Sequence, residues 1–314
     1  MQRREFISAS LSMLLAVPAQ AAEPLDDIPI IDTHVHLFDG RRPQGAPYKG
    51  SAQWERERGG VALPSTYRPF AKPLNIVGAI EVEASPWVED NLWVLEQMQG
   101  DPLFVGTIGD LEPEKPDFAE LLDRHRKNPL FLGLRCGNLW GRRLADQLGD
   151  RRFVDGLKRL AEAQMVMDTA DPSMDLLQAV LRTSDAVPNL RIVLDHLPGF
   201  DPMLQERGAY DAVLKEFGGR PHIYAKLSGV ERRPVHGLAA NREKLDMMLS
   251  VFGEDRVLFG SDWPNSWGRA TPAEIVSLAR SYFATRSRAA AEKFFWKNSL
   301  TAYRWRKRAP NQPG

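Results

Sequence analysis

The residues of this chain with the clearest chemical potential are His34 and His36, which close an apolar stretch near the start of the sequence. Alternate residues of an extended strand point to the same side, so both imidazoles can reach one point. Two imidazoles at one point can hold a metal ion or polarise a carbonyl oxygen. A lone histidine in a strand is more often a satisfied core residue, so it is the pair that predicts a functional site.

Two further polar residues follow apolar stretches later in the chain. Asp262 ends the run VLFGSD (257–262) and precedes a Trp-Pro turn. A carboxylate there could take a proton from water as a general base, or it could cap the turn that follows it. His196 ends a similar run within LDHLP (194–198), and this position favours a functional role for it too.

The elements that must position these residues are eight short apolar stretches, each followed by a polar turn and usually by helical periodicity. Continuous apolar stretches of this length suit a parallel sheet that is buried on both faces. The sequence therefore predicts a single α/β domain, a (β/α)8 TIM barrel. An open doubly wound sheet is disfavoured, since the glycine-rich nucleotide fingerprint after the first strand is missing. We expect strands at 29–34, 75–83, 103–110, 130–136, 165–171, 190–196, 222–228 and 256–262, and helices at 89–99, 117–127, 151–164, 173–183, 211–217 and 241–252.

Three segments fall outside this alternation. Residues 39–72 are rich in Gly, Pro, Arg and Tyr and too long for an ordinary connection, so we interpret them as a loop over the barrel mouth that could cover a substrate. Residues 294–306 have the pattern of a helix that closes the barrel. Residues 309–314 are expected to form a flexible tail.

The composition is that of an ordinary globular protein, with 43% apolar and 26% charged residues over 314 positions. Its 41 basic and 41 acidic residues balance, so no net field draws the chain to nucleic acid or to an anionic membrane. We therefore expect a small-molecule partner. Cys136 is the only cysteine, which excludes an intrachain disulfide.

The first 21 residues have the layout of a cleavable export signal. Arg3 and Arg4 precede an apolar run at 7–17, and AQA at 19–21 offers the small residues of a cleavage site. Paired arginines followed by one residue and a phenylalanine resemble the twin-arginine signal, which exports folded proteins. An uncleaved anchor is the alternative, but the run is shorter than the roughly 20 residues of a membrane span. We expect a periplasmic or otherwise exported protein that keeps 39 basic and 40 acidic residues and has no later membrane segment.

Taken together, these motifs resemble the amidohydrolase superfamily, and more closely its amidohydrolase-related branch, which includes sugar-acid and dicarboxylate lactonases. The resemblance is carried by IDTHVHLFD (31–39), LDHLP (194–198), KLSG (226–229) and FGSDWP (259–264), in this order over about residues 28–305. Each motif is short, but the set is specific to the branch. The resemblance implies a hydrolase in a barrel domain over residues 22–308. It also implies that His34, His36 and His196 polarise the scissile carbonyl, directly or through a metal, while Asp262 activates water.

The metal content that the resemblance implies is at most one divalent ion. Binuclear members use a carboxylated lysine or a glutamate on the fourth strand, whereas this strand ends in Arg135 and Cys136, and the fifth strand offers aspartates in place of a histidine. A single Zn²⁺ held by His34, His36 and Asp262 is chemically sensible. Lactonases of this branch also work without tightly bound metal, so both states stay open. No organic cofactor is expected.

Substrate contacts are assigned to polar and aromatic residues around the expected barrel mouth. Arg135 could read a carboxylate or the lactone oxygen with two parallel donors, or it could form an ion pair with Asp168 or Glu83. Lys226 could contact the substrate or form a salt bridge. Glu83 could orient the ring of His36 or pair with Arg135. Tyr48 and Trp263 could form the apolar walls of a site for a sugar-like ring, although aromatic loop residues often only fill space.

The leading hypothesis is hydrolysis of a small polar lactone, a sugar-acid or dicarboxylate lactone. The alternative is mononuclear-zinc decarboxylation of an aromatic or muconate-type acid. Relatives with that activity depend on a further histidine at the fifth strand, and the DTAD sequence at 168–171 lacks it. A barrel retained only for ligand binding is a third hypothesis, and it predicts the loss of at least one strand-end residue among His34, His36, His196 and Asp262, none of which is lost.

Overall fold

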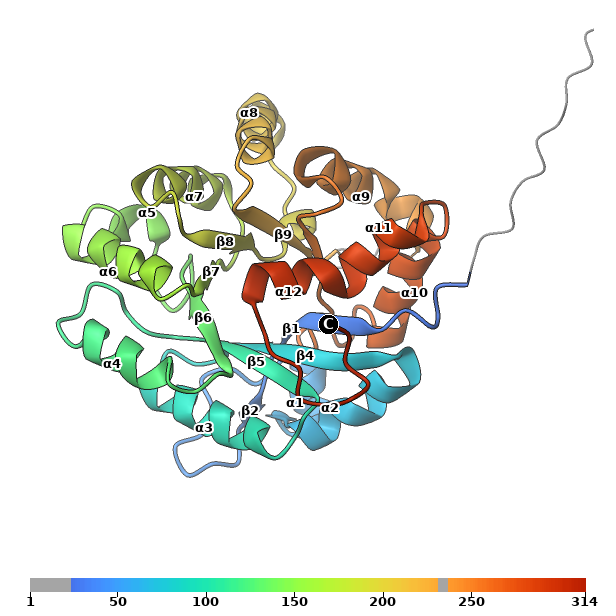
Figure 1. The fold of residues 1–314 in the computed structure, drawn as a ribbon, viewed down its shortest axis with the longest axis horizontal. Coiled ribbons are helices and arrows are strands. Elements are labelled where there is room, and N and C mark those ends of the chain that lie inside the picture. The colour runs from blue at the N-terminus through green and yellow to red at the C-terminus, as the bar shows by residue number, and fades with distance from the viewer. Residues whose placement is uncertain (1–23, 231–236) are drawn as a thin grey trace, which may run out of the picture.

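Eight parallel strands form one sheet that curves into a nearly closed barrel (Figure 1). The computed structural model describes residues 24–230 and 237–314, so the expected signal peptide at 1–21 lies outside the described residues. The barrel strands coincide with the eight predicted ones and confirm the TIM-barrel fold. In sheet order they are β1 (Ile30–Val35), β4 (Ile76–Val82), β5 (Phe104–Gly109), β6 (Phe131–Arg135), β7 (Val166–Asp168), β8 (Arg191–Leu194), β9 (Ile223–Leu227) and β10 (Val257–Phe259).

The first and last strands of the sheet meet just beyond their regular parts. The backbone N–H of His36 donates to the carbonyl of Trp263 at 2.8 Å, and the N–H of Asp262 donates to the carbonyl of His34 at 2.9 Å. These bonds bring the chemically active ends of β1 and β10 side by side. Two candidate motifs that are more than 200 residues apart in the sequence thus share one edge of the barrel.

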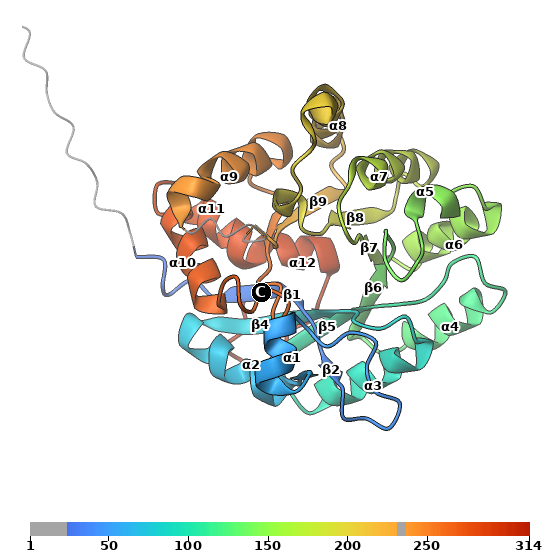
Figure 2. The ribbon, with the colours of Figure 1, turned by 180° about the vertical axis from the view of Figure 1, so that it is seen from behind.

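Helices surround the strands on the outside of the barrel, as both views show (Figures 1 and 2). Six of them match the predicted helices, and a seventh, α10, was not predicted. Within residues 24–230 and 237–314, none of the helices combines the length and apolarity that a bilayer span requires. The matching helices are α3 (Val88–Gln99), α4 (Phe118–His125), α6 (Arg151–Glu162), α7 (Met174–Ala186), α8 (Arg207–Gly218) and α9 (Leu238–Phe252), and they are joined by α10 (Pro272–Phe283) and the short α5 (Leu144–Gln147).

The long segment after β1 is more regular than its sequence indicates. It forms a two-stranded antiparallel pair, β2 (Phe38–Asp39) with β3 (Val61–Ala62), and two helices, α1 (Ala52–Arg58) and α2 (Pro64–Ala71). The side chain of Ser51 caps α1 by accepting from the N–H of Trp54 at 3.1 Å. Trp54 is buried in edge-to-face contact with Trp263 and Trp267, so aromatic burial stabilises a segment with little periodicity.

The C-terminal segment closes the end of the barrel that faces the viewer in Figure 1, where α12 crosses the strands. It comprises α11 (Arg288–Glu292), a π-helical turn η4 (Lys293–Lys297) and α12 (Asn298–Tyr303), which fits the expected closing helix. Tyr303 and Trp305 are buried in the apolar cluster inside the barrel. Residues 309–314 differ from the flexible tail that was expected, because Gln312 is buried and donates to the carbonyls of Val77 and Pro102 at 2.9 and 2.7 Å.

Candidate active site

The end of β1 is held in place by Asp32, two residues before His34. One oxygen of Asp32 accepts from the backbone N–H groups of Ser261, at 2.8 Å, and His34, at 3.2 Å. The other oxygen accepts from the hydroxyl of Tyr67 at 2.6 Å. This buried carboxylate therefore ties β1 to the end of β10 and to α2. It fixes where His34 and His36 stand relative to the residues that follow β10.

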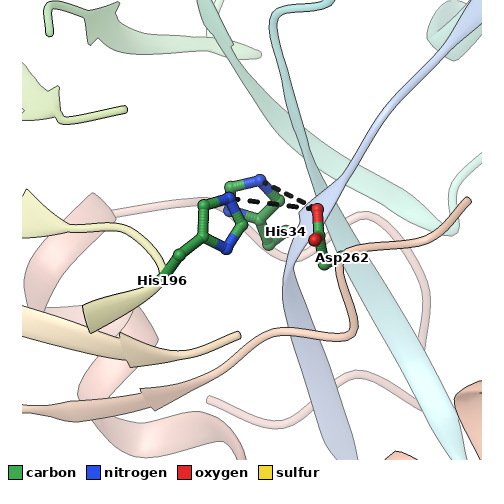
Figure 3. Close-up of side chains that lie close together, drawn as sticks. All are labelled: His34, His196 and Asp262. Atoms are coloured by element: carbon green, nitrogen blue, oxygen red, sulfur yellow. Dashed lines mark ion pairs between the residues drawn. The ribbon is translucent and has the colours of Figure 1, made fainter. Parts of the chain in front are cut away.

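Three candidate histidines converge on one oxygen atom of a fourth candidate residue, Asp262. The Nε2 atoms of His36, His34 and His196 lie 3.4, 3.7 and 3.9 Å from Oδ1 of Asp262. All four side chains are almost completely buried. Figure 3 shows two of these histidines facing the Asp262 carboxylate from different strands. The structure thus brings together the residues that the sequence singled out from three separate strand ends.

For His36 and His196, the hydrogen bond made by Nδ1 determines that Nε2 is the ring nitrogen that faces Asp262. Nδ1 of His36 lies 2.7 Å from the carbonyl oxygen of Val82, and since a carbonyl only accepts, this nitrogen carries the hydrogen. Nε2 of a neutral His36 then presents a lone pair toward Asp262. Nδ1 of His196 is similarly bonded to the hydroxyl of Ser228 at 2.9 Å. Such bonds to the far side of an imidazole are the usual means of orienting a metal-binding histidine.

The donor set fits a single divalent metal. His34, His196 and Asp262 each offer a ligand atom, and these atoms lie within 4.8 Å of one another. Nε2 of His34 and Oδ1 of Asp262 are buried and have no hydrogen-bond partner among the described residues. Buried lone pairs that face each other repel unless a cation or a proton lies between them. The expected set was His34, His36 and Asp262, whereas the group found in the structure has His196 in the place of His36.

The protonation states are those that a metal site requires. Burial is the largest influence on the pKa of His34 and lowers it well below its ordinary range, so this ring is neutral near pH 7. Burial by itself would raise the pKa of Asp262, but the electrostatic influence of His196 and of the neighbouring rings of His36 and His34 outweighs it and holds this pKa below its usual value. A neutral imidazole and an ionised carboxylate are the forms that bind a divalent ion.

A layer of buried ion pairs lies beneath the histidines. Nζ of Lys226 is 2.5 Å from a carboxylate oxygen of Asp168, 3.0 Å from Asp195 and 3.4 Å from Nδ1 of His34. The hydroxyl of Tyr303, from α12, donates to Asp168 at 2.9 Å. Lys226 is completely buried and therefore forms the salt bridge that was one of its two expected roles. Its expected role as a substrate contact is wrong for this structure.

Arg135 takes part in the same layer from β6. Its Nη2 is 3.2 Å from Asp195, its Nη1 is 3.8 Å from Glu83, and its Nε donates to the carbonyl of Thr169 at 3.0 Å. The expected ion pair with Glu83 is present, although long, whereas Asp195 takes the place of Asp168 as the closer partner. Arg135 nevertheless borders the open space above the site.

A cavity of about 280 Å³ opens above the histidines. This volume is close to the lower end of the range for small-molecule sites, which suits a single sugar-sized ring. The ring centroid of Tyr48 lies 5.6 Å from that of His36, so Tyr48 borders the cavity, and its contact with a substrate ring stays a prediction. The lining residues are His36, Tyr48, Glu83, Ala84, Arg135, Asn138, Leu139, Trp140, Ala170, Asp171, His196 and Asn265.

Trp263 does not line this cavity, so the expectation that it forms a wall of the substrate site is wrong. It is completely buried, with its ring centroid 5.0 Å from that of Trp54 and 4.9 Å from that of Tyr67. The physical reason is that the chain has left the strand here. Asp262 has a left-handed backbone conformation, with a φ angle of 57°, and the next side chain enters the aromatic cluster instead of the cavity.

Three loop residues of the cavity were missed by sequence reasoning. Asn265 donates to Oδ2 of Asp262 at 2.9 Å, Trp140 donates to Glu83 at 3.0 Å, and Asn138 follows the end of β6. The signal for Asn265 was its place three residues after Asp262 in a Trp-Pro turn. No periodicity marks the other two, because they lie in a loop whose path the sequence pattern does not specify.

A TIM barrel with three histidines and an aspartate at the carboxyl ends of its strands defines a class of hydrolytic enzymes, and the family comparison agrees. The amidohydrolase family model matches residues 31–305, and the chain belongs to this family.

Two comparisons concern proteins of Burkholderia multivorans. An L-fucono-1,5-lactonase of Burkholderia multivorans is 28% identical over 85% of this chain and 92% of its own length. The crystal structure of an amidohydrolase with bound zinc, also from Burkholderia multivorans, superposes with a TM-score of 0.77 at 24% identity, covering 88% of this chain and all of that one.

A third comparison has another activity in its name. The structure of a 5-carboxyvanillate decarboxylase from Novosphingobium aromaticivorans, complexed with manganese, has a TM-score of 0.66 at 16% identity, covering 89% of this chain and 97% of that one. At this identity the likeness shows a shared fold. The chain is thus a hydrolase by family, and its reaction has to be argued from the site.

Proposed function

We propose that this protein opens a small polar lactone by adding water across the ring ester, giving a hydroxy acid. The observation that carries the proposal is the convergence of three imidazole nitrogens on Oδ1 of Asp262, within 3.4 to 3.9 Å, at the edge of a sugar-sized cavity. The similarity to a protein named L-fucono-1,5-lactonase supports the same reaction class.

Asp262 serves as the general base in this proposal. Its pKa lies below the ordinary range, so it is ionised at neutral pH and can accept a proton from water. Asn265 holds Oδ2 at 2.9 Å, which leaves Oδ1 as the oxygen that faces the histidines. The reacting water and the carbonyl carbon of the lactone would lie on the cavity side of Asp262 and the rings, because gaps of 3.4 to 3.9 Å between Oδ1 and the ring nitrogens are too short to hold them.

His34, His36 and His196 can stabilise the negative charge that develops on the carbonyl oxygen through a bound metal ion, or by hydrogen bonds where Nε2 carries a proton. The donor set fits a divalent ion held by His34, His196 and Asp262. When bound, such an ion polarises a carbonyl and acidifies water. Zinc is the metal that the chemistry of two or three imidazoles and one carboxylate favours, and a solved relative contains it.

The cavity favours a neutral sugar lactone over a dicarboxylate lactone. Among the described residues that line it, Arg135 is the one side chain with a permanent positive charge, and it is already engaged by Asp195 and Thr169. Recognition of two carboxylates ordinarily uses several cationic donors. The remaining polar lining, Asn138 and Asp171 among it, suits the hydroxyl groups of a sugar.

The test is a substrate screen of the purified protein. L-Fucono-1,5-lactone, D-glucono-1,5-lactone, 2-pyrone-4,6-dicarboxylate and 5-carboxyvanillate are each assayed for proton release and for carbon dioxide, with zinc or with a chelator. We expect turnover of a sugar lactone and at most one equivalent of metal per chain. Carbon dioxide from 5-carboxyvanillate without lactone opening would replace this proposal with the decarboxylase alternative. Two equivalents of metal would contradict the single site.

We further propose that the protein acts outside the cytoplasm. The support is the arrangement of Arg3, Arg4, the apolar run at 7–17 and the AQA site at 19–21, all of which lie in the sequence before the described residues. A twin-arginine route would allow the barrel to fold, and to take up a metal, before it is exported.

A further inference from the structure

Glu83 is a buried carboxyl group of the catalytic cavity that the steps above do not use. It follows β4, and its side chain is 5% exposed and lines the cavity with His36 and Arg135. Strand β4 lies on one side of β1, and the end of β10, which carries Asp262, lies on the other. Glu83 and Asp262 are therefore separated by the histidine-bearing end of β1, as an acid and a base on opposite sides of one substrate would be.

The two oxygens of Glu83 have different surroundings. Oε2 accepts from Nε1 of Trp140 at 3.0 Å and from the backbone N–H of Ser85 at 3.1 Å. Oε1 makes no hydrogen bond to a described residue, and its nearest cation, Nη1 of Arg135, is 3.8 Å away. Two donors fix Oε2 as an acceptor, so in the protonated acid the hydrogen resides on Oε1. The group is thus oriented as a proton donor.

The charges around Glu83 favour the protonated form near pH 7. Burial is the largest influence and raises the pKa of Glu83 to about 8. Arg135 from β6 opposes this increase, Asp110 at the end of β5 adds to it, and Trp140 and Arg142 from the loop after β6 oppose it more weakly. On its own strand, Glu81 is a second buried carboxyl group.

We propose that Glu83 is the general acid that protonates the leaving ring oxygen as the lactone opens, an inference that rests on the proposed lactonase function. Water adds to the carbonyl carbon and loses a proton to Asp262. The bond between that carbon and the ring oxygen then breaks, and the ring oxygen takes the proton from Oε1 of Glu83. Asp262 afterwards releases its proton to solvent, and Glu83 takes one up. The sum is lactone plus water giving hydroxy acid.

Leaving-group dependence distinguishes an acid from a merely structural carboxyl group. The hydroxyl released by a sugar lactone is nearly as weak an acid as water, whose pKa is about 15.7, and needs protonation. The phenol released by dihydrocoumarin has a pKa of about 10 and can leave as an anion. Glu83→Gln should therefore lower kcat/KM for L-fucono-1,5-lactone about 100-fold or more, but for dihydrocoumarin less than about fivefold. The glutamine oxygen can still accept from Trp140 and Ser85, which preserves the fold.

Glu81→Gln is the matched control. Glu81 is buried on the same strand and accepts from the hydroxyl of Thr107, but it does not line the catalytic cavity. This variant should change kcat/KM for both lactones by a similar small factor. Equal losses on both lactones in Glu83→Gln would overturn the role as an acid. If the wild-type protein opens neither lactone, the proposed function fails, which is a different result from an acid that is merely misassigned.

A second measurement on the wild-type protein covers the case in which Glu83→Gln does not fold. The rate on L-fucono-1,5-lactone, corrected for uncatalysed hydrolysis, should fall as pH rises through about 8, since the acid form of Glu83 is lost there. The rate on dihydrocoumarin should not show this decline. The same decline for both substrates would contradict the assignment.

Discussion

Four residues around the catalytic cavity have left-handed backbone conformations, which side chains other than glycine adopt at a cost. One is Trp140, with a φ angle of 58°, and the other three follow their barrel strands within three residues. The φ angles of these three are 54° for Asp171, 58° for His196 and 57° for Asp262. Each conformation costs on the order of 1–2 kcal/mol, and aspartate, asparagine and histidine are the residues that tolerate it best. Each of these three residues lies just beyond the end of its barrel strand, where the chain turns away. Such strain is found where geometry serves function, which agrees with a catalytic role for His196 and Asp262.

The buried cation Lys226 yields a prediction about stability. Lys226→Met leaves Asp168 and Asp195 without their closest positive partner, so the free energy of unfolding should fall by about 3–5 kcal/mol. Urea unfolding followed by circular dichroism measures this loss. Lys127→Met is the control, because Lys127 is exposed and forms no ion pair with a described residue, and it should change stability by about 0.5 kcal/mol or less. Equal effects of the two variants would show that the buried ion pairs contribute little.

At the residue scale, the sequence identified which strand ends carry chemistry but not the depth of each side chain. Lys226 and Ser228 both point inward from the end of β9, yet only Ser228 reaches His196, because Lys226 lies one layer deeper in the barrel. Trp263 follows Asp262, where the backbone is left-handed, and it lies in the aromatic cluster with Trp54 and Tyr67. The pattern of residue types and their spacing predicts where a strand lies. The depth and direction of each side chain depend on how neighbouring strands are aligned, and the whole barrel sets that alignment.

At the scale of elements, the last residues of the C-terminal segment are held against the barrel by the side chain of Gln312, which makes four hydrogen bonds. Gln312 donates to two carbonyls, and its own oxygen accepts from the N–H groups of Arg308 and Ala309 at 2.6 and 2.9 Å. Gln312→Ala should lower the free energy of unfolding by about 1–3 kcal/mol, because buried backbone groups lose their partners. The exposed neighbour supplies a control in Asn311→Ala, which should melt with the wild type. Identical melting temperatures for both variants would mean that the tail is not needed for closure.

The eight strands were predictable because buried parallel strands are apolar on both faces and stand out as continuous runs. Helix α10 was not predicted, although the sequence at its start contains a capping-box motif. Thr271 caps it, and Glu274 bonds back to the N–H of Thr271, the pattern that Thr-x-x-Glu predicts. Helices α1 and α2 were harder to predict from the sequence, because they are stabilised by contacts such as that of Trp54 with Trp263, more than 200 residues away.

At the scale of the whole molecule, a localisation experiment tests the proposed export. Arg3→Lys with Arg4→Lys should retain the protein in the cytoplasm, because the twin-arginine route depends on the arginine pair. Fractionation followed by immunoblotting measures the exported share. Arg41→Lys with Arg42→Lys is the control, since these arginines lie in the barrel domain. Unchanged export of the Arg3 and Arg4 variant would contradict the proposed route.

The measurement that tests the central claim most directly is lactone opening by Asp262→Asn. Asparagine has nearly the same size and tolerates the left-handed backbone at this position, so the fold should persist, as its circular dichroism and melting temperature would show. Without a carboxylate to take the proton from water, kcat/KM for L-fucono-1,5-lactone should fall by about 1000-fold relative to the wild type. A folded Asp262→Asn variant that opens this lactone at the wild-type rate would contradict the account.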